Sequence, residues 1–141
     1  MIKTPHLSTD AIIRLYDNNE VYQGTVLIQR LNEPEGIALP GGFVDIGESV
    51  EDALKREMCE EVSLDVEIQE LLGIYSDPSR DPRFHTASAV YICKAYGTPK
   101  SGDDAKDIYV YKEDELPFDK LVFDHEKILK DYLKKFKSRS A

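Results

Sequence analysis

Three glutamates in the first half of the chain have a spacing that suits a divalent metal ion. Glu57, Glu60 and Glu61 stand at positions i, i+3 and i+4, so a helix would carry all three carboxylates on one face. Like charges at this spacing each destabilise an isolated helix by roughly 0.2–0.5 kcal/mol, so stability alone gives no reason to gather them. A hard cation such as Mg²⁺ binds oxygen ligands and offsets the repulsion. The pattern therefore indicates a metal site.

The alternative is an acidic helix face that is simply solvated, as most charge runs are. Apolar residues at helical spacing argue against it, because Glu57 and Glu61 lie at the edge of the stripe that they form: Val50, Ala53, Leu54 and Met58. A carboxylate beside a buried face needs a positive partner. Arg56 is placed to pair with Glu60 at i+4, which leaves Glu57 and Glu61 in need of another positive group.

The surrounding elements must position this helix. Strands are predicted for residues 11–16, 21–30, 37–39, 66–76, 86–96 and 107–111, from β-branched and apolar residues between turn residues. The acidic helix is predicted to begin at Ser49, which forms a capping-box-like pair with Asp52, and to end near Val62. Apolar spacing predicts a final helix from His125. Because the order shows no regular βαβ rhythm, the expected fold class is α/β, with a mixed sheet between helices.

Size and composition limit the classes of function. The 141 residues are expected to form a single domain, 1–141, that is large enough to fold alone. The net charge of −9 argues against a nucleic-acid partner, because binding to the phosphate backbone needs clustered Lys and Arg. A small anionic molecule remains compatible with this charge where metal ions neutralise its phosphates.

Location is constrained by two further patterns. No window approaches the 18 apolar residues of a membrane span, and the first residues show no basic region leading into an apolar run, so no membrane partner and no signal peptide are expected. Two cysteines, Cys59 and Cys93, give no disulfide framework. The expected compartment is the cytoplasm.

The segment from Gly42 to Leu64 resembles the signature of the Nudix hydrolases. That signature reads Gly, five residues, Glu, seven residues, Arg-Glu-apolar-any-Glu-Glu-any-Gly-apolar. Eight of its nine specified positions match, at Gly42, Glu48, Arg56, Glu57, Met58, Glu60, Glu61 and Leu64. The ninth, normally glycine, is Ser63. Glycine there would provide a left-handed helix end, and another residue in that conformation costs roughly 1–2 kcal/mol. A slightly altered helix exit is expected, with no loss of activity.

The resemblance implies a fold, a metal and a set of roles. The family's fold is an α/β/α sandwich with a mixed sheet, and its members cleave nucleoside diphosphates linked to another moiety, using Mg²⁺ or Mn²⁺. By resemblance, the metal ligands are Glu57, Glu60, Glu61 and the backbone carbonyl of Gly41. Arg56 would orient the glutamates through ion pairs, and Glu48 would brace the loop or bind a metal ion through water.

The general base is not defined by the signature. Relatives take it either from a loop after the box or from a box glutamate. Asp103 and Asp104 are the loop candidates here, with Asp104 as a catalytic residue and Asp103 as a substrate contact. The alternative for both is a polar turn, which glycine and aspartate often form.

The segment 76–85 resembles the loop after the box in ADP-ribose pyrophosphatases, in which a proline like Pro78 is associated with ADP-ribose specificity. The stretches 102–105 and 123–125 are also similar to that subgroup. Arg80 and Arg83 could bind phosphate or ribose oxygens through their planar donor forks. The alternative is that both form salt bridges within the loop, to Asp77 and Asp81.

Further substrate contacts can be named. Arg30, at the end of a predicted strand, is a weaker phosphate candidate, and Phe43 and Phe84 are candidates for stacking on adenine. The expected reaction is Mg²⁺-dependent hydrolysis of ADP-ribose to AMP and ribose 5-phosphate. The alternatives are another nucleotide-linked diphosphate, an oxidised nucleoside triphosphate, or a nucleotide sensor without catalysis. The resemblance also implies a homodimer.

Overall fold

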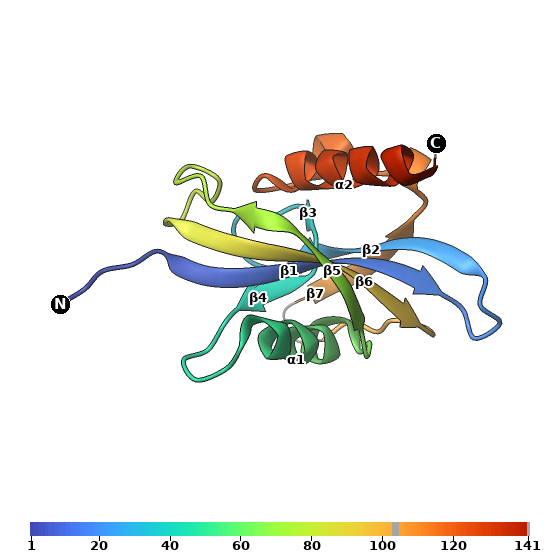
Figure 1. Ribbon diagram of the computed structural model, residues 1–141, viewed down its shortest axis with the longest axis horizontal. Coiled ribbons are helices and arrows are strands. Elements are labelled where there is room, and N and C mark those ends of the chain that lie inside the picture. Colours follow the sequence, from blue (N-terminus) through green and yellow to red (C-terminus); the bar gives the residue numbers. More distant parts are fainter. Residues whose placement is uncertain (103–104, 141) are drawn as a thin grey trace.

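The computed structural model describes residues 1–102 and 105–140, and in it a seven-stranded mixed sheet lies between two α-helices (Figure 1). The strands are β1 (His6–Tyr16), β2 (Tyr22–Arg30), β3 (Ile37–Ala38), β4 (Gly41–Phe43), β5 (Glu67–Tyr75), β6 (Thr86–Tyr96) and β7 (Ala105–Tyr111). The helices are α1 (Val50–Val62) and α2 (His125–Ser140), with short 3₁₀ helices at Glu113–Glu115 and Phe118–Lys120. The expected α/β sandwich is confirmed.

The sheet order is β3-β2-β1-β6-β5, with β4 paired to β1 and β7 paired to β2. β1 and β6 run parallel in unbroken register from His6 opposite Thr86 to Tyr16 opposite Tyr96, and the other pairs are antiparallel. β6 has the predicted bounds, whereas β1 begins five residues earlier than the predicted residue 11. Pairing with β6 extends it through polar residues that look like a loop in the sequence.

The short strand β4 was not predicted. It lies antiparallel to β1, with Gly41 opposite Asp10. A Cβ atom on Gly41 would lie 2.1 Å from Asp10 Oδ1 and 2.5 Å from the carbonyl oxygen of Thr9, so only glycine allows this approach. Two consecutive glycines give no strand propensity, and the pairing depends on the partner strand.

Each face of the sheet packs on one helix (Figure 1). Side chains alternate along β1, so Ala11 and Ile13 face α1 whereas Ile12 faces α2. On the α1 side the fully buried helix residues are Leu54, Met58 and Val62, and on the α2 side they are Ile128, Leu129 and Tyr132. This packing fixes the rotation of α1 and therefore the direction of its carboxylates. None of the helices in residues 1–102 and 105–140 is long and apolar enough to cross a membrane.

The predicted start and end of α1 are confirmed, but the altered helix exit expected at Ser63 is not seen. Ser49 caps its start, because the Ser49 hydroxyl accepts a hydrogen bond of 3.1 Å from the backbone N–H of Asp52. The helix ends at Val62, and Ser63 takes the left-handed conformation (φ 57°, ψ 37°) in which the Nudix signature has glycine.

Candidate active site

Arg56 on α1 is the centre of an ion-pair network that joins the helix to the preceding loop. Its guanidinium makes two bonds to Glu48, of 3.1 Å from Nε and 2.6 Å from Nη2. Nη1 donates to Glu57 Oε1 at 2.9 Å and to Glu60 Oε2 at 3.2 Å, and Nη2 donates to the carbonyl of Phe43 at 3.1 Å. This geometry gives Arg56 the orienting contacts that the resemblance implies.

Glu48 braces the loop. Besides its bonds from Arg56, its Oε1 accepts a hydrogen bond of 2.9 Å from the backbone N–H of Asp45. The Arg56 guanidinium, followed by this N–H, lowers the pKa of the Glu48 carboxyl below its ordinary value. Glu48 therefore stays ionised, and it ties the loop before α1 to the acidic face of that helix.

Glycines let β4 lie against the acidic face of α1. The backbone N–H of Gly41 donates a hydrogen bond of 3.0 Å to Glu61 Oε1. A Cβ atom on Gly42 would lie 2.2 Å from the carboxyl carbon of Glu57. Glu61 is buried and Glu57 is half-buried, whereas the Glu60 side chain is 60% exposed. The three carboxylates thus share a helix face but differ in their access to solvent.

A cavity of about 440 Å³ opens beside these glutamates. Its lining includes Glu57 and Glu61 from α1, Gly41 to Phe43 from β4, and residues of β1, β2 and the segments 80–83 and 123–125. Glu60 is not part of the lining. The volume lies within the range of about 300–1,000 Å³ that is usual for small-molecule sites.

The donor set suits Mg²⁺ or Mn²⁺, since Glu57, Glu61 and the backbone at Gly41 supply oxygen atoms at one end of the cavity. Within residues 1–102 and 105–140, no three His, Cys, Asp or Glu side chains converge into a metal-binding group. The three glutamates are instead held by hydrogen bonds from other groups. Arg56 donates to Glu57 and Glu60, and the backbone N–H of Gly41 donates to Glu61. Carboxylates that are positioned in this way still present further oxygen lone pairs.

The four described substrate candidates, Arg30, Phe43, Arg80 and Arg83, all line the cavity. Arg80 is buried, with its side chain 4% exposed, and it makes two bonds to Asp124, of 2.9 Å from Nε and 2.7 Å from Nη2. Arg83 makes two bonds to Asp81, of 3.0 Å from Nε and 2.8 Å from Nη2. The alternative of salt bridges within the loop is correct for Arg83, whereas Arg80 pairs with a residue from a distant segment.

Arg30 differs from the other two arginines. Its guanidinium donates to the carbonyls of Pro34 at 2.8 Å and Glu33 at 3.3 Å, and it has no ion pair within residues 1–102 and 105–140. Burial, followed by the positive charge of Arg83, lowers the pKa of Arg30. The carboxylates of Glu61, Asp81 and Asp10 offset part of this lowering.

Aromatic rings lie close to the guanidinium groups of Arg83 and Arg30. The guanidinium carbon of Arg83 lies 5.8 Å from the ring centre of Phe43, 5.2 Å from that of Phe84 and 5.4 Å from that of Phe123. Arg30 lies 5.0 Å from the ring centre of Phe123. Phe43 thus belongs to a group of aromatic rings whose faces suit stacking with a nucleotide base.

Sequence reasoning missed several buried polar residues of this cavity: Ser8, Asp10, Thr86 and His125. Asp10 is 9% exposed and accepts a hydrogen bond from the Ser88 hydroxyl. His125 is 2% exposed, and its Nδ1 accepts a hydrogen bond of 2.9 Å from the backbone N–H of Leu39. Burial lowers the pKa of His125 to about 4. The similarity of residues 123–125 to the ADP-ribose pyrophosphatases was the one signal for His125, and no pattern singled out Asp10.

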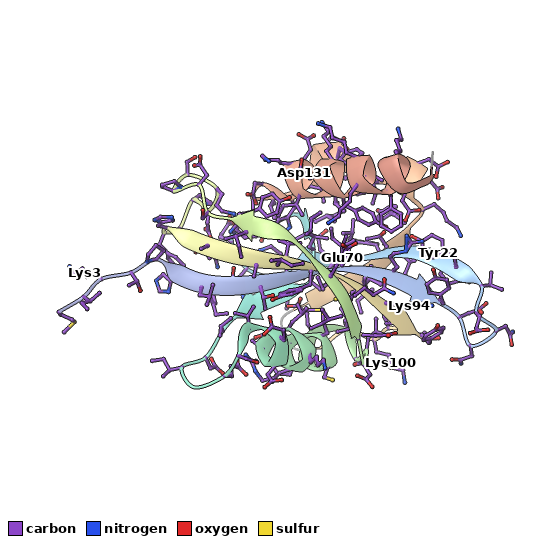
Figure 2. The ribbon with its side chains drawn as sticks, in the orientation of Figure 1. Lys3, Tyr22, Glu70, Lys94, Lys100 and Asp131 are labelled. Carbon is purple, nitrogen blue, oxygen red and sulfur yellow. The ribbon has the colours of Figure 1, made fainter. Side chains whose placement is uncertain are left out.

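The predicted base candidates Asp103 and Asp104 lie outside the described residues. The chain before them lies against the end of α1, where Lys100 is marked in Figure 2. The backbone N–H groups of Lys100 and Gly102 donate to the carbonyls of Val62 and Glu61, each at 2.9 Å. A Cβ atom on Gly102 would lie 1.8 Å from the carbonyl oxygen of Glu60, so glycine permits this contact.

Comparisons with known proteins place this geometry in a family. The family model described as the NUDIX domain matches residues 5–132. The ADP-ribose pyrophosphatase of Methanocaldococcus jannaschii is 47% identical over 133 residues, which cover 92% of this chain and 74% of that protein. A MutT-like protein of Streptomyces ambofaciens is 36% identical over 59 residues, 42% of this chain and 36% of that protein.

Solved structures show the same fold. A MutT/nudix family protein from Enterococcus faecalis aligns with a TM-score of 0.80 at 28% identity, over 98% of this chain and 64% of that one. A bifunctional NMN adenylyltransferase/ADP ribose pyrophosphatase from Francisella tularensis, complexed with AMP and a manganese ion, aligns with a TM-score of 0.78 at 23% identity, over 95% of this chain and 42% of that one. This chain thus spans less than two thirds of both. The NUDIX domain of Shewanella oneidensis NrtR, complexed with ADP ribose, aligns with a TM-score of 0.77 at 23% identity, over 96% of this chain and 90% of that one.

Proposed function

We propose a reaction from one premise: this chain belongs to the Nudix family and is a Nudix hydrolase. The proposed reaction is hydrolysis of the diphosphate bridge of ADP-ribose to AMP and ribose 5-phosphate, with Mg²⁺ or Mn²⁺ bound. One observation carries it. A single cavity is lined by Glu57 and Glu61 at its acidic end and also by Arg30, whose guanidinium donates hydrogen bonds to the carbonyls of Pro34 and Glu33. The relative that is 47% identical and named ADP-ribose pyrophosphatase supports the choice of substrate.

The acidic end would hold the metal ions through Glu57, Glu60, Glu61 and the carbonyl of Gly41. Bound there, the metal supplies charge neutralisation at the diphosphate and lowers the pKa of a coordinated water. Arg56 keeps two of the carboxylates oriented, at 2.9 Å from Glu57 and 3.2 Å from Glu60. This pre-orientation reduces the reorganisation that binding requires.

The rest of the chain binds and positions the substrate. Arg30 neutralises one phosphate and Phe43, with the neighbouring rings, stacks on the base. Water attacks one phosphorus atom, and the bridging P–O bond breaks, so that the second phosphate leaves with the bridging oxygen. A carboxylate takes the proton from the attacking water, and we assign this role to Asp104.

The test is an assay with a panel of nucleoside diphosphate derivatives. The purified chain is incubated with Mg²⁺ and ADP-ribose, dinucleotides or sugar nucleotides, and the release of phosphate esters is measured. AMP is expected to form fastest from ADP-ribose. Faster release from another member contradicts the substrate assignment, and nucleotide binding without release from any member contradicts catalysis.

Glu61→Gln tests the acidic end in the same assay. The amide oxygen can still accept the Gly41 N–H, so the substitution removes charge and keeps the fold. Turnover is expected to fall about 100-fold, which corresponds to about 2.7 kcal/mol of transition-state stabilisation. Glu67→Gln on the exposed start of β5 is the matched control and should keep full turnover. Near-normal turnover of Glu61→Gln at saturating Mg²⁺ would refute its role as a metal ligand.

A further inference from the structure

We propose that residues 100–102, in the chain before β7, set the affinity of the acidic end for a divalent metal ion, with Gly102 as the positioning residue. These residues lie against the last turn of α1, the turn that carries Glu60 and Glu61. The inference rests on the proposed function, because it takes those two glutamates as metal ligands. It concerns the backbone that carries the two carboxylates and not the carboxylates themselves.

The end of α1 is held by backbone donors from this distant part of the chain. The last four carbonyl groups of an α-helix have no partner within the helix, and in α1 these include the carbonyls of Glu61 and Val62. The N–H of Gly102 donates to the Glu61 carbonyl and the N–H of Lys100 donates to the Val62 carbonyl, each at 2.9 Å. The position of the last turn therefore depends on a tertiary contact.

Gly102 is required by space and not by backbone conformation, since its φ lies outside the left-handed region. A Cβ atom on it would lie 1.8 Å from the carbonyl oxygen of Glu60, 3.0 Å from the carbonyl carbon of Glu60 and 3.3 Å from the Cα atom of Glu61. All three are backbone atoms, so rotation of a side chain cannot relieve the overlap. Any side chain at position 102 must move either residues 100–102 or the last turn of α1.

A shift of this turn would move two of the proposed metal ligands together. Glu61 is held at both ends, because its carbonyl accepts the Gly102 N–H and its Oε1 accepts the Gly41 N–H at 3.0 Å. The Glu60 carboxylate accepts a hydrogen bond of 3.2 Å from Arg56, while its carbonyl lies against Gly102. Contacts one step behind the ligands orient them and tune the affinity for the metal ion.

The Ser63 hydroxyl adds a bond to the same segment, but the contact does not depend on it. This hydroxyl donates to the Lys100 carbonyl at 3.2 Å, whereas the two bonds to the helix end come from backbone N–H groups. The contact therefore requires backbone donors at positions 100 and 102 and the absence of a side chain at position 102. It does not require a particular side chain at position 63.

The test measures Mn²⁺ binding to the substrate-free chain by calorimetry, so it does not depend on turnover. Gly102→Ala should raise the dissociation constant for Mn²⁺ about tenfold. Gly73→Ala is the matched control and should bind like the native chain, because the nearest atom to its Cβ is a side-chain carbon of Tyr75 at 3.6 Å. If Gly102→Ala melts at a lower temperature but binds Mn²⁺ with the native constant, the segment only stabilises the helix end, and the proposal is overturned.

A second pair of variants tests the segment without adding an atom at position 102. Lys100→Pro removes the N–H that bonds to the Val62 carbonyl and should raise the dissociation constant for Mn²⁺ at least about threefold. Lys100→Ala removes the same side chain but keeps the N–H, so it should bind like the native chain. This pair decides the question if Gly102→Ala does not fold. Equal dissociation constants for the two Lys100 variants would overturn the proposal.

Failure of the proposed function gives a different pattern. If the native chain binds no Mn²⁺, the metal role of the acidic end and this proposal are both overturned. If Gly102→Ala binds Mn²⁺ more weakly while ADP-ribose is not the fastest substrate, this proposal is supported and only the substrate assignment fails.

Discussion

Two parts of the cavity lining are built from partners at very different distances along the chain: the acidic end, Glu57 and Glu61, and the buried residues Asp10, Arg80 and His125, called the deep wall below. At the acidic end, Arg56 bonds to residues 1 to 13 positions away, and its side chain is 30% exposed. Around the deep wall, the bonded pairs are separated by 44 positions for Arg80 and Asp124, 78 for Asp10 and Ser88, and 86 for Leu39 and His125. At the acidic end, partly solvated contacts between residues close in sequence orient the carboxylates. Around the deep wall, buried contacts between residues far apart in sequence hold together the segments that line the cavity.

This difference predicts where substitutions act. Partly exposed ion pairs contribute little to stability because water already solvates both charges. A buried pair contributes little compared with an apolar pair, but loss of one member leaves a charge without its partner. Substitutions at the acidic end should therefore reduce turnover, and substitutions of the bonded pairs around the deep wall should reduce the free energy of unfolding.

The largest expected effect is that of Arg80→Met. The side chain is 4% exposed, and its removal leaves the Asp124 carboxylate, 17% exposed, without its two hydrogen bonds. The free energy of unfolding, measured by urea titration, should fall by about 3–5 kcal/mol. Arg56→Met should cost less than about 1 kcal/mol in the same measurement.

A double variant separates charge from packing. Arg80→Met with Asp124→Leu removes both members of the pair and should recover most of the stability that the single variant loses. Equal destabilisation by Arg80→Met and Arg56→Met would contradict the distinction between the two regions.

Acid should lower the free energy of unfolding through protonation of His125. Burial lowers the pKa of this histidine from 6.5 to about 4, so between these values the unfolded chain binds a proton that the folded chain does not. The stabilising contribution is full above pH 6.5 and is lost as the pH falls toward 4, by about 3 kcal/mol in total. Urea titrations at pH 7, 6, 5 and 4 measure it.

His125→Asn is the control for this titration, because it lacks the ionisable ring. Its stability should fall less steeply between pH 6.5 and 4 than that of the native chain. Parallel curves for the two proteins would show that another group causes the acid loss.

The same contrast explains what the sequence could predict. The end of α1, its Ser49 cap and the pair between Arg56 and Glu60 follow from spacing within one segment, and each is present in the structure. Asp10 gave no signal, because Ser8, Thr9 and Asp10 read as polar loop residues until the parallel pairing with β6 buries them. The partner of Arg80 is not Asp77 or Asp81 but Asp124, and no local pattern connects residues 44 positions apart.

Gly42→Ala tests the junction between the two regions. The added Cβ would lie 2.2 Å from the carboxyl carbon of Glu57 and must displace it. Turnover should fall about tenfold, the equivalent of about 1.4 kcal/mol, because a small misplacement of a catalytic group is costly. Gly73→Ala is the matched control, since the nearest atom to its Cβ is a side-chain carbon of Tyr75 at 3.6 Å. Steady-state kinetics in which both variants match the native chain would show that β4 does not position Glu57.

The smallest effect is expected at Ser63, where the chain departs from the Nudix signature. The residue is in the left-handed conformation, φ 57°, and its hydroxyl donates a hydrogen bond of 3.2 Å to the carbonyl of Lys100. Ser63→Gly relieves about 1–2 kcal/mol of strain, but it loses the bond and frees the unfolded backbone, so stability should change by less than about 1 kcal/mol. Ser63→Ala keeps the strain and loses the bond, so it should be the less stable of the two in urea. Turnover should stay native in both, and a tenfold loss in Ser63→Gly would instead show that the Lys100 contact at the end of α1 positions the acidic end.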